Sequence, residues 1–154
     1  MNKPTEIVLS IYSTIFQGKV SYRKQASLEI EFSATHDDDE MFVEIAVDDQ
    51  TLLSQPLTTK STKLIYMVDD EPAQHELQIR LKGPPRGSQL HIHKILIEGL
   101  NMRMTMEDSG TCVMNNVDHV PSEYMGQAGY QSLKFTTPIY PWLLANEQKD
   151  TYYL

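Results

Sequence analysis

The sequence predicts an all-β fold, an antiparallel β-sandwich of the jelly-roll type. Apolar and polar residues alternate along most of the chain, which is typical of strands with one buried face. Clusters of Asp, Gly and Pro separate the alternating segments at strand-length intervals. Because 154 residues suit one domain, we expect residues 1–154 to form a single sandwich.

The alternating segments define the expected strands in chain order. The first apolar segment, residues 6–17, is rich in β-branched residues, which favour a strand over a helix. Further strands are expected over residues 28–33, 43–48, 64–68 and 77–82, and from residue 90 onward. The spacing of the turns predicts roughly seven to nine strands.

Residues 90–106 change their facing twice. The apolar residues begin at one parity, switch to the other after His93, and switch back from residue 100. One extra residue in a strand reverses the facing of all that follow, so we expect bends near Lys94 and Gly99. A strand that bends in this way often crosses from one sheet to the other. The alternating Leu and Met side chains of residues 100–106 are expected in the core.

The C-terminal third is less regular. Residues 107–154 lack sustained alternation, and we expect them to close the sandwich. Proline is favoured at the first position of a helix, so Pro141 and the apolar residues after it predict at most one short helical turn.

Composition and charge exclude several classes of function. The formal net charge is −8 and the basic residues are scattered, so we expect no binding to nucleic acid. No apolar run approaches the roughly 20 residues that cross a bilayer, and the N-terminus lacks the pattern of a signal peptide. The single cysteine, Cys112, permits no internal disulfide, which fits a reducing compartment.

No catalytic motif appears in the sequence. The nucleophile elbow, the phosphate-binding glycine loop and the zinc-finger spacing are all missing. The paired carboxylates of glycoside hydrolases are neighbours in space rather than in sequence, so the sequence leaves them open. We expect a protein without enzymatic activity.

His91 and His93 are the candidates for a transition-metal site. Residues two apart on a strand face the same way, and a His-x-His pair supplies two ligands in some jelly rolls. Glu98 follows the parity switch and should point away, so a third ligand would have to come from His36, His75 or His119. The alternative is that both histidines are polar residues on the outer face, with Leu90 and Ile92 inward.

The acidic turns are the candidates for a calcium site. Hard cations prefer several carboxylate and carbonyl oxygens held by loops. Two acidic loops at one end of a sandwich could supply them, and the candidate ligands are Asp37, Asp38, Asp39, Asp69 and Asp70. The alternative is that these are solvated turns, where aspartate is favoured by its own backbone hydrogen bonds. Without such a site we expect no cofactor.

Aromatic residues near the C-terminus are the candidates for an interface. Trp142 lies beside prolines, where it packs at the end of the sandwich, offers a flat platform for a sugar, or contacts a partner. Tyr152 and Tyr153 precede the last residue, where they dock on a neighbouring subunit or belong to a frayed end.

Two parts of the chain resemble known proteins. The segment HELQIRLKG (residues 75–83), followed by LHIHKILIEGLNM (residues 90–102), resembles the paired inner strands of calcium-dependent, xylan-binding carbohydrate-binding modules with a jelly-roll fold. The segment YMGQAGY (residues 124–130), followed by LKFTTPIYPWLLAN (residues 133–146), is similar to the C-termini of uncharacterised proteins of marine bacteriophages, especially cyanophages. The resemblance implies a β-sandwich and a phage origin.

From these observations we expect a non-enzymatic, virion-associated structural protein. It would be a capsid decoration or cement protein, or a tail accessory protein, made in the host cytoplasm and located in the virion. Its partners would be phage structural proteins and further copies of itself, with no membrane involved. The alternative is a carbohydrate-binding module that takes a glycan, with calcium as the candidate ion. A lesser alternative is an acidic inhibitor of a host protein.

Overall fold

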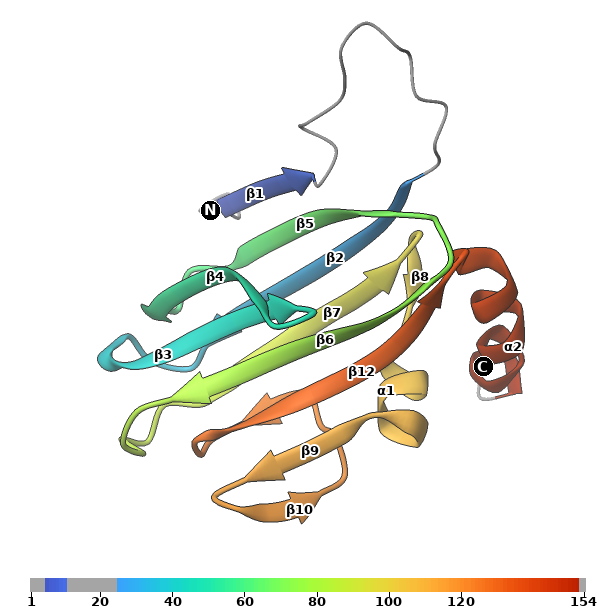
Figure 1. Ribbon diagram of the computed structural model, residues 1–154. Helices are drawn as coiled ribbons and strands as arrows, with labels where there is room; N and C mark the ends of the chain where they lie inside the picture. The colour runs from blue at the N-terminus through green and yellow to red at the C-terminus, as the bar shows by residue number, and fades with distance from the viewer. Residues whose placement is uncertain (1–4, 11–24, 153–154) are drawn as a thin grey trace, which may run out of the picture.

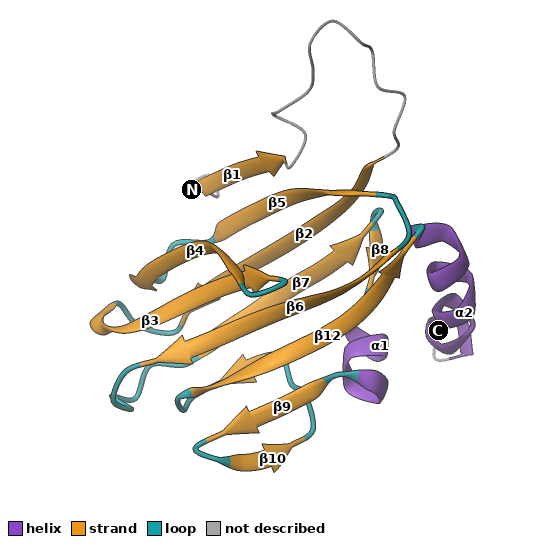
Figure 2. Ribbon diagram, viewed as in Figure 1, coloured by secondary structure: helices purple, strands orange, loops and turns teal. Residues whose placement is uncertain are grey.

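The computed structural model describes the backbone of residues 5–10 and 25–152, and the side chains of residues 25–146. Two β-sheets lie face to face, and two helices flank them on the right of the view (Figure 1). Strands make up most of the fold (Figure 2). The predicted antiparallel β-sandwich of the jelly-roll type is therefore confirmed.

The first sheet, sheet A, has the strand order β1-β5-β2-β7-β11, and β8 also pairs with β7. All of its pairs are antiparallel except β1 with β5, which is parallel. Its strands are β1 Thr5–Ser10, β2 Gln25–Ala34, β5 Thr62–Asp69, β7 Leu90–Ile97, β8 Leu100–Asn101 and β11 Tyr124–Met125.

The second sheet, sheet B, has the strand order β10-β9-β12-β6-β3-β4 and is antiparallel throughout. Two register shifts interrupt the pairing of β3 with the edge strand β4, and Pro56 lies in β4. The strands of sheet B are β3 Asp38–Val47, β4 Gln50–Leu57, β6 Ala73–Lys82, β9 Thr111–Met114, β10 Val117–His119 and β12 Gly129–Thr137.

The core lies between the two sheets, as the alternation predicts. In β2 every second residue is buried, and β5 and β6 alternate in the same way. Apolar side chains from both inner faces meet there and remove their surface from water, which is the main favourable term in folding. Completely or almost completely buried members include Ile30, Ile45, Leu64, Leu77, Ile79, Leu81 and Phe135.

The strands predicted for individual segments are present in the structure. The segments expected over residues 28–33, 64–68 and 77–82 lie within β2, β5 and β6, and most of residues 43–48 lies within β3. The first segment begins with β1, and its residues 11–17 lie outside the described part of the chain. The described part holds twelve strands rather than seven to nine, because β8, β10 and β11 are only two or three residues long.

Three pairs of strands are joined by two-residue turns. The turns are Asp48-Asp49, Glu98-Gly99 and Asn115-Asn116, and in each both residues have positive φ. These values are those of a type I′ turn, whose twist matches that of antiparallel strands. Only Gly99 is free of the steric cost that other residues bear in this conformation.

The predicted change of direction near Gly99 is present as the Glu98-Gly99 turn, but the predicted crossing of the strand to the other sheet is wrong. β8 turns back and pairs with β7 in sheet A, and helix α1, Arg103–Ser109, follows. Leu100 and Met104 are not buried, whereas Met102 and Met106 are. Met102, at the start of α1, and Met106 lie four residues apart, and residues with this spacing share one face of a helix as well as one face of a strand.

The helix predicted around Pro141 is present as α2, Ile139–Tyr152, which at 14 residues is longer than the short turn expected; it packs beside β12 and α1. Asp70 Oδ1 accepts a hydrogen bond of 2.6 Å from the Ile139 amide and so satisfies one N–H at the start of the helix. Pro141 lies in the first turn, and Leu143 is buried. In the described part of the chain no helix is long and apolar enough to cross a membrane.

Candidate functional site

The strand β7 carries the two histidines and a bulge. The register with β2 shifts between Glu31 and Phe32, which pair with Lys94 and Ile92 and leave His93 opposite no residue. This confirms the predicted irregularity near Lys94. Leu90 and Ile92 are buried, His93 is exposed and His91 is half-buried, so the histidines belong to the outer face of sheet A.

Four side chains form a row across β11, β7 and β2, which we call the His91 row: Tyr124, His91, His93 and Ser33. The rings of Tyr124 and His91 stack at a centroid distance of 4.4 Å and an angle of 10°. The rings of His91 and His93 meet edge to face at 4.1 Å. His93 Nε2 lies 2.7 Å from Ser33 Oγ, within hydrogen-bonding distance. The row is therefore ordered by contact from end to end.

Partial desolvation of the His93 ring lowers its pKa, and the neighbouring His91 lowers it further. The carboxylates Glu31 and Glu123 act in the opposite direction with smaller effect. The lowered pKa favours the uncharged imidazole, which can both accept and donate hydrogen bonds.

A chain of charged groups continues from the row to helix α1. Glu123 Oε2 lies 3.6 Å from His91 Nε2, and Glu123 Oε1 lies 3.0 Å from Arg103 Nη2. Arg103 Nε lies 3.7 Å from Glu107 Oε1 within the helix. Asn101 Oδ1 accepts a hydrogen bond of 3.0 Å from the Arg103 amide at the start of α1. These contacts fix Arg103 between two carboxylates.

A narrow cleft, which we call the α1 cleft, opens between β7, α1 and the loop before β11. It has about 370 Å³ of empty space including its open mouth, of which about 30 Å³ can hold the centre of a water molecule. The buried side chains of Ile92, Ile95 and Met106 contribute apolar surface. The other lining residues are His93, Lys94, Asn101, Arg103, Glu107, Pro121, Ser122, Glu123 and Gln131.

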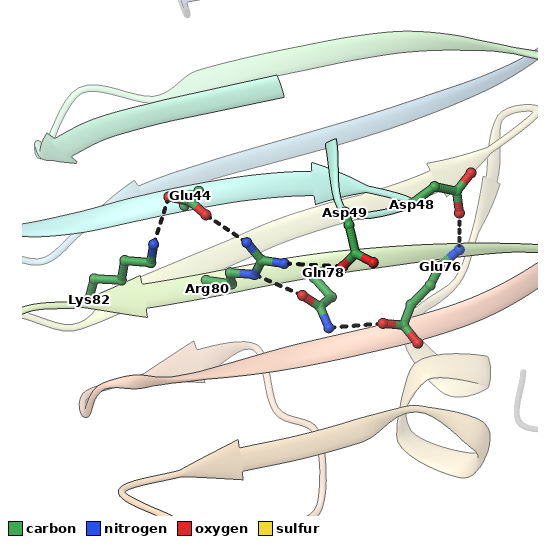
Figure 3. A network of polar contacts seen from close by, with 7 residues as sticks. All are labelled: Glu44, Asp48, Asp49, Glu76, Gln78, Arg80 and Lys82. Atoms are coloured by element: carbon green, nitrogen blue, oxygen red, sulfur yellow. Dashed lines mark hydrogen bonds and ion pairs between the residues drawn. The ribbon is translucent and has the colours of Figure 1, made fainter. Parts of the chain in front are cut away.

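The outer face of sheet B carries a second polar cluster, drawn in Figure 3. Glu44 binds both Arg80 Nη1, at 2.7 Å, and Lys82 Nζ, at 3.0 Å. Arg80 Nε donates to Gln78 Oε1 at 2.7 Å, and Gln78 Nε2 donates to Glu76 Oε1 at 2.8 Å. The hydrogen bonds from Lys82 and Arg80 lower the pKa of Glu44. These groups bind one another, which indicates a structural role.

Asp48, His75 and Thr137 stand in the order of a hydrolase triad. Asp48 Oδ2 lies 2.7 Å from His75 Nδ1, and His75 Nε2 lies 3.1 Å from Thr137 Oγ1. However, Thr137 is buried, and its hydroxyl donates to the carbonyl oxygen of Glu71. A nucleophile needs an exposed oxygen whose proton goes to the base. This trio therefore joins the start of β6 to the end of β12 and offers no nucleophile.

The acidic candidates for calcium lie at two ends of the sandwich. Asp37 lies near the start of β5, because its Oδ1 accepts a hydrogen bond from the amide of Thr59 just before that strand. Asp69 is the last residue of the same strand. An eight-residue strand is roughly 23 Å long, so the loop of Asp37, Asp38 and Asp39 does not meet Asp69 and Asp70.

Several of these carboxylates serve the backbone instead. Asp38 Oδ1 accepts hydrogen bonds from the amides of Glu40 and Met41, and Asp70 binds the start of α2. The hydrogen bond from the Thr59 amide lowers the pKa of Asp37. In the described residues no group of three or more His, Cys, Asp and Glu is placed to hold a metal ion.

The other histidines do not join His91 and His93. His36 lies in the loop after β2, where its amide binds Ser88, and His75 is held by Asp48 in sheet B. His119 is an exposed residue of the edge strand β10. The structure thus places a tyrosine and a carboxylate beside the histidine pair. It does not place there the third histidine that a transition-metal site would need.

The predicted interface residues lie near helix α2. Trp142 is half-buried, and its ring meets Phe135 edge to face at 6.1 Å. It also lines a shallow groove with His75 and Lys134. Tyr152 is the last residue of α2, and its side chain lies outside the described residues, as does Tyr153.

Sequence reasoning missed Glu123, Arg103 and Glu107 as site residues. The spacing of Arg103 and Glu107, four residues apart, is a helical signal that a helix prediction would have used. Nothing in the sequence signals the contact of Glu123 with His91, because the residues are 32 positions apart and meet through the pairing of β11 with β7.

No protein-family model and no curated protein matches the chain. Two solved structures resemble it. The first is vCBM60 in complex with galactobiose, with a TM-score of 0.48 and 17% identity over 69% of this chain and 95% of that one. The second is selenomethionine vCBM60, described with a circular permutation that links two families of calcium-dependent carbohydrate-binding modules. Its TM-score is also 0.48 and its identity 17%, over 70% of this chain and 88% of that one. The chain is thus similar at low identity to carbohydrate-binding modules, and such a likeness carries no ligand from them to this chain.

Proposed function

We propose that this protein is a glycan-binding module, and that the His91 row and the α1 cleft together form its binding surface. The observation that supports the proposal is their juxtaposition. A row of contacting rings ends, at His93, on the rim of a cleft whose polar side chains contact one another. Ligand sites are typically concave, with an apolar lining and a few convergent polar groups.

Tyr124 is the stacking residue in this proposal. The apolar face of a pyranose ring packs well on an aromatic ring, which offers a large apolar area. One face of the Tyr124 ring is covered by His91, and β11 is the last strand of sheet A. The residue is 43% exposed, so the tyrosine offers area to a ligand at the sheet edge.

Arg103 and Glu123 are the hydrogen-bonding residues. Arg103 presents several N–H donors and Glu123 two acceptor oxygens, which suit the hydroxyl groups of a sugar. Their mutual contact at 3.0 Å, together with the contact of Glu123 with His91, holds both side chains in place before a ligand arrives. Preorganisation of this kind reduces the entropy that binding would otherwise lose.

The same geometry favours binding over glycoside hydrolysis. Hydrolases place the bond to be cleaved between two carboxylates. Here the guanidinium of Arg103 occupies the space between Glu107 and Glu123, at 3.7 and 3.0 Å. A glycosidic bond could not take that position without displacing it.

A glycan array, read with calcium and again with EDTA, tests the proposal. We expect binding to at least one glycan class, and the EDTA condition decides whether calcium takes part. Tyr124→Ala should weaken binding about tenfold, since losing an aromatic partner costs roughly 1–1.5 kcal/mol. Tyr140→Ala is the matched control, because Tyr140 is an exposed tyrosine on α2. No binding in either condition would remove the proposal.

No observation on the described residues favours the virion-associated role or the inhibitor of a host protein. Both stay predictions of the sequence, together with self-association and a location in the virion. Mass spectrometry of purified virions tests the first, and a pull-down from host lysate tests the second.

A further inference from the structure

The α1 cleft is too narrow for a sugar ring. About 30 Å³ of it can hold the centre of a water molecule, and one water needs roughly 10–15 Å³ on this measure. The cleft thus has room for about two waters, or for one small substituent of a ring that stays outside.

The side chains that line the cleft specify what this substituent is. Ile92, Ile95 and Met106 present apolar surface, where ordered water finds few partners and a methyl group is favoured in its place. The four charged lining residues are Lys94, Arg103, Glu107 and Glu123, whose formal charges cancel. A neutral ligand therefore suits the cleft better than an acidic sugar.

We infer that the ligand class is N-acetylhexosamine glycans, with the acetamido methyl group inserted in the α1 cleft. This inference rests on the proposed glycan-binding function. The acetamido group places an N–H and a carbonyl oxygen directly beside its methyl group. Glu123 can accept from the N–H, and Arg103 can donate to the carbonyl. The methyl group of a deoxy sugar has no N–H and carbonyl oxygen beside it. It would therefore leave Glu123 and Arg103 without a hydrogen-bonding partner on the ligand.

Three trisaccharides with the same β-1,4 linkage test the inference by titration calorimetry. They are the trimers of N-acetylglucosamine, of glucosamine and of glucose. We expect the N-acetylated trimer to bind at least about fourfold more tightly than the glucose trimer, the factor that burying one methyl-sized group gives. The glucosamine trimer should gain nothing over glucose, because it lacks the methyl group.

The variant Ile95→Phe fills the cleft and should remove the preference for the N-acetylated trimer over the glucose trimer. Saturation-transfer NMR on the wild-type protein gives a readout that does not depend on this variant folding. The acetamido methyl protons should receive the strongest transfer from the protein.

The outcomes separate the two proposals. Equal affinity for the N-acetylated and glucose trimers, or a methyl signal no stronger than the ring protons, overturns the inference and leaves glycan binding standing. If no trimer binds and the glycan array is also negative, the proposed function itself is wrong.

Discussion

Replacing Glu44 with glutamine removes the charge at the centre of the sheet B network (Figure 3). The Glu44 side chain is only 11% exposed and serves two cations, Arg80 and Lys82. Glutamine keeps the shape of the side chain but has one acceptor oxygen, so its amide N–H₂ must face one of the two cations. The variant should therefore destabilise the fold without creating a cavity.

The size of the loss follows from the two contacts. The bond with Arg80 is charge-assisted and largely shielded, and such bonds contribute about 1.5 kcal/mol at the lower end of their range. The Lys82 side chain is 58% exposed, and an exposed ion pair contributes about 0.5 kcal/mol. We expect Glu44→Gln to lower the free energy of unfolding by about 2 kcal/mol, or the melting temperature by about 4–8 °C.

The effect should depend on pH. The hydrogen bonds from Lys82 and then Arg80 lower the pKa of Glu44 below its ordinary value of 4.5. A lowered pKa in the folded state adds stability above the ordinary value, and this stability is lost as the pH falls through the lowered one. Protonated glutamate resembles glutamine, so the difference between wild type and variant should shrink toward zero in acid.

Urea unfolding near neutral pH and at successively lower pH measures this difference. Glu40→Gln is the matched control, because Glu40 pairs with Arg86 on the surface, and its loss should cost less than about 0.5 kcal/mol. A difference for Glu44→Gln that stays constant down to acid pH would show that the charge of Glu44 contributes nothing, and the reasoning would fail.

Three further substitutions test two glycine positions and the start of α2. A Cβ at Gly129 would lie 2.0 Å from the carbonyl oxygen of Val113, so Gly129→Ala should cost at least about 2 kcal/mol in thermal unfolding. Gly99→Ala, where φ is +78° but the space is open, should cost only about 1 kcal/mol; a larger loss of stability for Gly99→Ala than for Gly129→Ala would show that the close contact at Gly129 does not matter. Asp70→Ala removes the hydrogen bond to the Ile139 amide and should cost about 1 kcal/mol in urea unfolding, whereas unchanged stability would show that the bond contributes nothing.

The sequence predicts the layers of the fold well because the core imposes a period of two. In β2 every buried residue follows from alternation alone, and the bulge at His93 follows from the change of parity. The helix α1 could not be predicted in this way. The spacing of Met102 and Met106 fits both a strand and a helix. Which of the two forms depends on contacts with distant residues, such as the hydrogen bond from the Met102 amide to the carbonyl oxygen of Ile95.

The candidate site was predicted only in part. His91 and His93 were placed on one face from their spacing alone. Their partners come from strands and loops whose pairing is set by the whole sandwich: Tyr124 reaches His91 because β11 pairs with β7 over two residues. Contacts between distant segments depend on register, and register cannot be read from one segment alone.

Both edge strands of sheet B are poorly suited to pair with a strand of another chain. Growth of a sheet by an added strand requires a continuous row of free N–H and C=O groups along its edge. Pro56 in β4 has no N–H, and the two register shifts in its pairing with β3 break the regularity of that edge. The opposite edge, β10, is only three residues long. Neither edge is a good template for another chain, so copies that associate through sheet B would have to do so through its outer face.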